Sequence, residues 1–256
     1  MKSFVFKIDH AVAEIFHNIY LAGGEFANFV MNFISFIAEA GILFLLVGIG
    51  LALFKRTRKI GGTILFAVAI GFLLTNVILK NTIQRVRPFQ SGLNDFYKWW
   101  LDAGASYESG YSFPSGHTTA ATAFAVAIFL TCKKKYSSWI LLFPLLMAIS
   151  RIYLMVHYFS DCVGGLIVGS VSAILGYLTV KWIYVSKLKL FVWARELDLF
   201  KSSKSNVATT NTHKNSNLEQ HKPAIEDYVY ITQAEELNSK SKETNTKKDE
   251  ETSNNK

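Results

Sequence analysis

Long apolar runs separated by short charged stretches set the pattern of this chain. The clearest run is residues 60–79, which holds 20 residues and no charged side chain. At about 1.5 Å rise per residue, such a helix crosses the ~30 Å hydrocarbon core of a bilayer. Four further apolar runs join it: 29–54, 118–132, 136–156 and 162–180. The run 29–54 is interrupted by Glu39 and the run 136–156 by Arg151. The pattern predicts an all-α, polytopic transmembrane helix bundle with five clear spans.

The segment 4–21 is the candidate for a sixth span. Five polar side chains interrupt its apolar residues: Lys7, Asp9, His10, Glu14 and His17. We interpret the segment as an amphipathic helix in the membrane interface, with a weak transmembrane helix as the alternative. It does not resemble a signal peptide, because no uninterrupted apolar stretch follows a basic start.

The chain divides into three regions by composition. Residues 1–28 are the N-terminal helix, 29–190 the transmembrane domain and 191–256 a polar tail. Ser, Thr, Asn, Lys and Glu dominate the tail, which is typical of segments that bury too little apolar surface to fold. We expect a disordered cytoplasmic tail, and its composition names no partner.

The net charge of +8 raises the question of nucleic-acid binding. From residue 201 onward nine Lys balance nine acidic residues, so the excess lies in residues 1–200. It gathers in three places: Lys55, Arg56, Arg58 and Lys59; Lys133 to Lys135; and Lys181, Lys187, Lys189 and Arg195. All three fall on one side of a five-span chain, which the positive-inside rule makes cytoplasmic. The charge therefore orients the protein, and we expect no nucleic-acid partner.

Small residues mark two of the runs as packing surfaces. Gly165 and Gly169 have the spacing that lets helix backbones approach closely in lipid, and residues 118–132 are rich in Ala and Thr. The run 118–132 has only 15 residues, which is short of a full bilayer core. Polar residues just before it should therefore lie near the outer headgroups.

Lys80 and Arg87 stand at the outer end of the run 60–79. Seven residues make about two helical turns, so we expect both side chains on one face of a helix that continues the span. Pro88 restricts Arg87 and should end that helix. Two cations on one edge form a clamp for an anion, although ordinary snorkelling also explains Lys80.

The sequence Pro114, Ser115, Gly116, His117 directly precedes the third run. Proline favours a helix start, Ser115 is a good N-cap, and Gly116 lets a ligand approach the backbone. The free amides of the first turn form an anion site, and His117 can donate a proton to a leaving oxygen. A simple N-cap followed by a surface histidine is the alternative.

The third stretch joins Arg151 to His157 and Asp161. His157 and Asp161 are four residues apart, so on one helical face Asp161 would fix the His157 tautomer and leave the other nitrogen free to attack. Arg151 adds a planar cation suited to phosphate oxygens. Metal ligation by the His and Asp is the alternative, but no further cluster has ligand spacing.

These three stretches resemble the type 2 phosphatidic acid phosphatase family of integral membrane enzymes. The family pattern, Lys-x6-Arg-Pro, Pro-Ser-Gly-His and Ser-Arg-x5-His-x3-Asp, is matched at 80–88, 114–117 and 150–161. The resemblance implies that His157 is the nucleophile of a phosphohistidine, Asp161 its orienting partner and His117 the general acid. It also implies that no metal or cofactor is needed. By the same resemblance the phosphoryl oxygens are held by Lys80, Arg87, Ser115, Gly116 and Arg151.

The expected function is hydrolysis of a lipid phosphate or diphosphate at the extracytoplasmic face of the cell membrane. Undecaprenyl diphosphate and phosphatidate-like lipids both remain as substrates, with Glu39 and the aromatic loop 89–113 as candidate determinants. Two alternatives stay open: phosphotransfer to a lipid alcohol through the same phosphohistidine, and a non-catalytic membrane protein that only binds anions.

Overall fold

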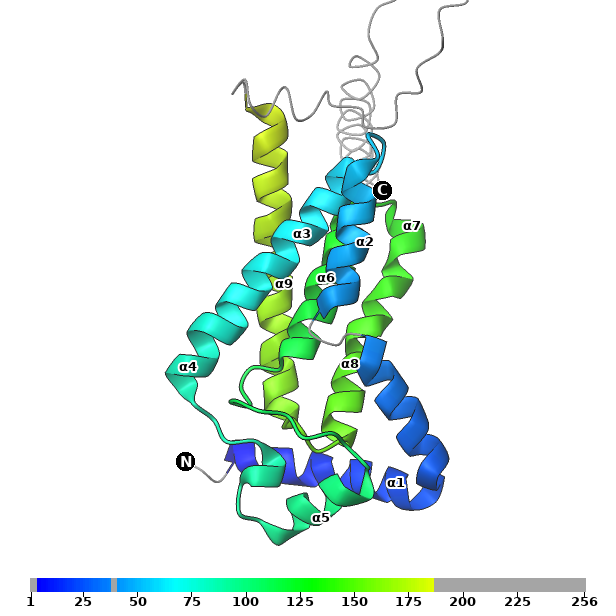
Figure 1. Ribbon diagram of the computed structural model, residues 1–256, viewed down its shortest axis with the longest axis vertical. Helices are drawn as coiled ribbons and strands as arrows, with labels where there is room; N and C mark the ends of the chain where they lie inside the picture. The colour runs from blue at the N-terminus through cyan, green and yellow to red at the C-terminus, as the bar shows by residue number, and fades with distance from the viewer. Residues whose placement is uncertain (1–3, 38–40, 187–256) are drawn as a thin grey trace, which may run out of the picture. The chain divides into compact units, whose positions relative to one another are not determined.

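The computed structural model describes residues 4–37 and 41–186. Over these residues the chain forms helices and no strand, which confirms the all-α fold class (Figure 1). The predictions for the tail and for Glu39 lie outside the described residues.

A bundle of packed helices forms the core of the described region. Its members are α2 (Ile42–Leu53), α3 (Arg58–Phe72), α6 (Gly116–Thr131), α8 (Leu142–Tyr153) and α9 (Phe159–Val185). Helix α9 packs against both α3 and α6, α2 packs against α3, and α8 packs against α6 (Figure 1). Their shared apolar core contains Ile64, Ala67, Met147 and Ala173, all fully buried.

Small residues on α9 allow the close packing of this bundle. A Cβ on Gly169 would lie 2.5 Å from the Cβ of Thr122 on α6. One on Gly176 would lie 2.7 Å from the backbone nitrogen of Ala67 on α3. Neither distance leaves room for a side chain. The predicted packing role of small residues in these two runs is therefore confirmed.

The helices agree with the membrane-spanning pattern of the sequence. Three described stretches are long and apolar enough to cross a bilayer: Arg58–Gln90, Lys134–Tyr153 and Phe159–Val185. Helices α1 and α2 add a fourth if the bent pair is one span. Helix α6 is apolar but has 16 residues, about 24 Å of helix. Each of the five predicted runs thus contains a helix, but the described residues provide three or four helices long enough to span, against the five spans predicted.

The first helix, α1 (Phe4–Ile37), bends at Gly24, where a φ of 53° and a ψ of −141° interrupt the helix. Its first half crosses the end of the bundle at which α8 ends and α9 begins, beside α5 (Asn94–Asp102) (Figure 1). Phe96 of α5 is fully buried there against Ala13 and Tyr158. Aromatic residues of the loop 89–113 therefore pack on α1, whose location in the membrane interface stays a prediction.

The two ends of the bundle differ in charge. The α2–α3 turn, the turn between α6 and α7 (Lys134–Ser137) and the C-terminal end of α9 lie at one end (Figure 1). Of the basic residues that the sequence grouped together, these segments hold Lys55, Arg56, Arg58, Lys59, Lys133 to Lys135 and Lys181. Helix α5 and the first half of α1 lie at the opposite end, together with the candidate site.

Candidate active site

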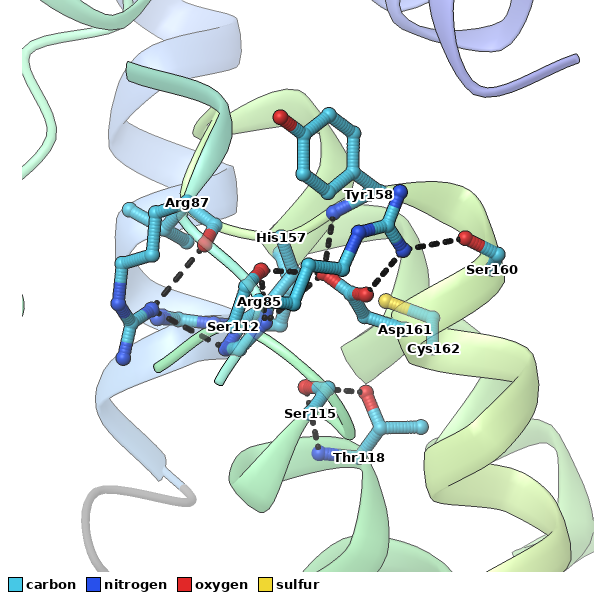
Figure 2. Close-up of polar contacts among 12 residues, drawn as sticks. Arg85, Arg87, Ser112, Ser115, Thr118, His157, Tyr158, Ser160, Asp161 and Cys162 are labelled. Atoms are coloured by element: carbon cyan, nitrogen blue, oxygen red, sulfur yellow. Dashed lines mark hydrogen bonds and ion pairs between the residues drawn. The ribbon is translucent and has the colours of Figure 1, made fainter. Parts of the chain in front are cut away.

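Four segments meet at the end of the bundle near α5. They are the stretch after α4 (Lys80–Ile83), the start of α6, the end of α8 and the turn before α9 (Figure 2). The structure brings together all eight residues that the sequence singled out: Lys80, Arg87, Ser115, Gly116, His117, Arg151, His157 and Asp161. Three separate motifs therefore form one site.

His157 is buried, with 2% of its surface exposed, at the centre of this site. Its Nε2 lies 3.3 Å from Nη1 of Arg87. A guanidinium only donates hydrogen bonds, so Nε2 accepts and the ring proton sits on Nδ1. Burial of the ring, with Arg87 and Arg151 nearby, lowers the pKa of His157 well below its usual value. The ring is therefore neutral near pH 7, with its lone pair at Nε2.

The expectation that His157 and Asp161 share one helical face is wrong. Helix α9 begins at Phe159, and its N-cap is Tyr158 with an extended backbone. Asp161 occupies the third helical position, where its Oδ2 accepts from the Tyr158 amide at 2.9 Å as part of a capping box. The turn before the helix still brings His157 Nδ1 to 3.6 Å from Asp161 Oδ2.

Ser112 lies beside these two residues (Figure 2). Its hydroxyl donates to Asp161 Oδ2 and lies 3.5 Å from His157 Nδ1. All three side chains are buried. Ser112 is therefore hydrogen-bonded to Asp161 and lies about as near to His157 Nδ1 as Asp161 does.

Two guanidinium groups converge on the open side of His157. Arg87 Nη1 lies 2.7 Å from Oε2 of Glu108, and Arg151 Nη2 pairs with the other oxygen, Oε1. Glu108 Oε2 is 4.0 Å from His157 Nε2. The planar Glu108 carboxylate thus occupies the space between both guanidinium groups and the unprotonated Nε2 of His157. Arg151 Nε is also buried without a hydrogen-bond partner in the described part of the chain.

The start of α6 forms another wall of the site. Ser115 is the N-cap, and its Oγ accepts from the amide of Thr118 at 3.4 Å, as the sequence predicted. A Cβ on Gly116 would lie 3.8 Å from Nζ of Lys80, so the Lys80 ammonium reaches the first turn of α6. Backbone amides and a cation together make this helix start attractive to an anion.

Lys80 and Arg87 do not share a helix, which corrects the sequence prediction. Helix α4 ends at Ile83, and Gln84 has a left-handed backbone with a φ of 51°. Arg87 is extended, at φ −70° and ψ 156°, because the residue before Pro88 avoids the helical region. The extended stretch nonetheless carries Arg87 to His157.

Two cavities of about 510 Å³ each flank His117 and Glu108. The first has an apolar wall that includes Leu45, Val68 and Phe72, and it ends at Lys80 and His157. Lys80 follows a π-helical segment, Leu73–Leu79, whose Asn76 also lines this cavity. An apolar wall that ends in cations and imidazoles suits a molecule with an apolar tail and an anionic head.

Sequence reasoning missed four polar residues of the site. Ser112 and Glu108 lie in the aromatic loop, where only the aromatic residues drew attention. Arg85 lies inside the first motif, two residues before Arg87. Asp9 was noted only as an interruption of an apolar helix, yet it is 1% exposed. A carboxylate on a mostly apolar helix was the available signal.

Metal ligation was the alternative for the His and Asp pair. Within the residues that the structure describes, no group of three or more His, Cys, Asp or Glu side chains gathers to hold a metal ion. The nearest neighbours of His157 are instead arginines, a serine and two carboxylates. This donor set favours binding of an oxyanion.

These observations define a class of protein: an all-helical membrane bundle that holds a neutral histidine beside two buried arginines. A family model of the PAP2 superfamily matches residues 61–184. The chain belongs to this superfamily, which confirms the resemblance seen in the motifs.

Named relatives and a solved structure agree with this membership. Undecaprenyl-diphosphatase of Sulfolobus acidocaldarius is 35% identical over 47% of this chain and 55% of its own length. Phosphatidylglycerophosphatase B of Bacillus subtilis is 33% identical over 56% of this chain and 70% of its own length. The crystal structure of a transmembrane PAP2 type phosphatidylglycerolphosphate phosphatase from Bacillus subtilis matches 72% of this chain and 89% of that chain, with 25% identity and a TM-score of 0.55.

Proposed function

We propose that this protein is a membrane lipid phosphatase that hydrolyses a lipid phosphate or diphosphate through a phosphohistidine at His157. One observation carries the proposal. The Glu108 carboxylate is faced by three groups: the unprotonated Nε2 of His157 and the guanidinium groups of Arg87 and Arg151. A phosphoryl group that displaces this carboxylate would lie between two guanidinium groups and beside a neutral nucleophile.

In the first half-reaction, Nε2 of His157 attacks phosphorus, and the bond from phosphorus to the lipid oxygen breaks. His117 donates a proton to that leaving oxygen. Arg87, Arg151, Lys80 and the first amides of α6 stabilise the charge on the equatorial oxygens. Phosphoryl transfer depends mainly on such positioning and charge stabilisation, and a single well-placed donor contributes about 10²–10³-fold in rate.

In the second half-reaction, water attacks the phosphohistidine. His117, now neutral, accepts a proton from this water, and inorganic phosphate leaves as the bond from phosphorus to Nε2 breaks. Asp161 and Ser112 hold the Nδ1 side of His157 throughout. The step consumes one water for each lipid phosphate. Since the protein's own side chains supply the nucleophile, the proton and the charge stabilisation, the proposed mechanism requires no metal and no cofactor.

The proposed substrates follow from the first cavity. Its apolar wall from α2 and α3 faces a lipid tail, and its far end presents Lys80 and two imidazoles to a phosphate. Undecaprenyl diphosphate and phosphatidate-like monoesters both fit this description. The two relatives are named for action on undecaprenyl diphosphate and phosphatidylglycerophosphate, so both lipids belong in the assay.

The basic segments at the opposite end of the bundle support an extracytoplasmic site. With those segments in the cytoplasm, the site faces the outer leaflet and the tail is cytoplasmic. Labelling of single engineered cysteines in intact cells tests this orientation. Reaction of a cysteine in the loop 89–113 only after permeabilisation would reverse it.

Phosphate release from detergent-solubilised protein tests the function. Undecaprenyl diphosphate, phosphatidate and phosphatidylglycerophosphate should be compared under one condition, with His157→Ala and the control His17→Ala, a histidine of α1 that stacks on Trp99. We expect release by the wild type and by the control, and none by His157→Ala. Rapid quench with labelled substrate should trap an acid-labile, base-stable phosphoenzyme. Undiminished turnover by His157→Ala would overturn the mechanism.

A further inference from the structure

We infer that Arg85, which no motif assigns, is a positioning residue that holds Asp161 and Ser112 against His157, and that Asp9 of α1 holds Arg85. This inference rests on the proposed phosphohistidine mechanism. It makes the N-terminal helix part of the support of the nucleophile.

The side chain of Arg85 divides its donors between two buried carboxylates. Its Nη1 lies 2.5 Å from Asp161 Oδ1, and its Nη2 lies 2.7 Å from Asp9 Oδ2. Nη1 also donates to Ser160 Oγ at 2.6 Å (Figure 2). Both carboxylates are fully buried, and a buried carboxylate is costly unless a cation or hydrogen-bond donors pair with it. Arg85 therefore fixes the orientation of the Asp161 carboxylate.

The backbone of Arg85 also fixes Ser112, the second residue that faces His157 Nδ1. Its carbonyl accepts from the amide of Ser112 at 2.7 Å. The hydroxyl of this same Ser112 donates to the second oxygen of Asp161 and lies beside His157 Nδ1. Arg85 thus contacts both residues that face Nδ1, one through its side chain and one through its main chain.

Asp9 holds Arg85 from the side away from His157. It accepts from the Ser160 amide at 2.9 Å, from Ser160 Oγ at 2.8 Å and from Arg85. The guanidinium of Arg85 also lies 3.9 Å from the centre of the Tyr158 ring. These contacts, with Asp161, Ser160, Asp9 and the Tyr158 ring, hold the Arg85 side chain away from the phosphate site, where Arg87 and Arg151 act. It keeps Asp161 in place without touching the substrate.

This geometry predicts a particular kinetic signature. A residue that orients the nucleophile should lower kcat when it is replaced, while a residue that binds phosphate should raise KM. A misplacement of about 1 Å at a reacting group can cost on the order of 10²-fold in rate. We expect Arg85→Gln to lower kcat by about 10²-fold, and Asp9→Asn by about 10-fold, with KM and orthovanadate affinity within threefold of wild type.

The pair is tested by a double-mutant cycle on the full chain. If Asp9 acts through Arg85, the double variant Asp9→Asn, Arg85→Gln should be no slower than Arg85→Gln alone. Arg85→Lys, which keeps the charge but carries its donors on a single nitrogen, should recover part of kcat. Glu14→Gln, an exposed acid on the same helix, and Arg56→Gln, an exposed arginine in the α2–α3 turn, are the matched controls.

The outcomes separate this inference from the proposed function. Wild-type turnover and its loss in His157→Ala establish the function first. A kcat within twofold of wild type in Arg85→Gln, or a raised KM with kcat unchanged, would then overturn the positioning role. If Arg85→Gln does not fold as judged by its melting temperature and gel filtration, the isosteric Asp9→Asn decides: lowered kcat with unchanged KM supports the role, and unchanged kcat refutes it.

Discussion

Glu108 carries the sharpest prediction about the phosphate site, because its carboxylate stands where we place the substrate. Both of its oxygens pair with buried guanidinium groups, and its side chain is 23% exposed. A phosphate must displace this carboxylate before it reaches His157. The substitution Glu108→Gln keeps the shape of the side chain and removes the competing charge.

The size of the effect follows from the two ion pairs. A hydrogen bond to a charged partner contributes about 1.5–3 kcal/mol net. Glutamine retains one carbonyl acceptor, and the partial exposure of Glu108 favours the low end, so the competition should fall by about 2 kcal/mol. This corresponds to roughly 30-fold in affinity. Orthovanadate and inorganic phosphate should therefore bind the variant about 30-fold more tightly.

Isothermal titration calorimetry with orthovanadate measures this change directly and does not depend on turnover. Asp95→Asn, which removes an exposed charge from α5 in the same loop 89–113, controls for general electrostatics. Its affinity should stay within threefold of wild type. An unchanged or weaker affinity in Glu108→Gln would show that Glu108 and the oxyanion do not compete for one place.

Three further predictions concern the nucleophile and the bundle. Since the pKa of His157 is lowered, its ring stays neutral as the pH falls through 6.5, so protonation of His157 should reduce kcat/KM only below that pH. A fall in kcat/KM that is centred above pH 6.5 and belongs to His157 would contradict this. Ser112→Ala should lower kcat by about 10-fold with KM unchanged, because Asp161 then loses a donor on the Nδ1 side, and a rise in KM alone would contradict it. Gly176→Val should lower the melting temperature in detergent, since its Cβ would overlap the α3 backbone and overpacking typically costs about 1–3 kcal/mol. Gly50→Ala, with nothing within 4 Å of the added Cβ, is the control and should stay within a few degrees.

The sequence predicted the parts of the fold that depend on local pattern. Apolar run length located the helices, and Ser115 before Gly116 predicted the start of α6 because a serine N-cap satisfies amides within its own turn. The same locality explains the two geometric errors. Helical spacing placed Arg87 on the helix of Lys80, but Pro88 imposed an extended backbone on Arg87. It also placed His157 on the helix of Asp161, but that helix begins only at Phe159.

The residues that were missed act over long sequence separations. Asp9 meets Arg85 76 residues later and Ser160 151 residues later. No periodicity or motif spacing reports such contacts, which depend on how the first half of α1 crosses the bundle. A buried carboxylate in an apolar segment indicates that a partner exists, but only the fold identifies the partner.

The position of Asp9 has a consequence for when α1 can pack onto the bundle during synthesis. At about 5–20 residues per second, the ribosome needs roughly 8–30 s to add the 151 residues between Asp9 and Ser160. Throughout that interval α1 lacks the partners that bury the Asp9 carboxylate, so this carboxylate must be solvated by other polar groups. Helix α1 can therefore dock only after α9 has begun to emerge, and a nascent chain that stops before α9 has no assembled nucleophile.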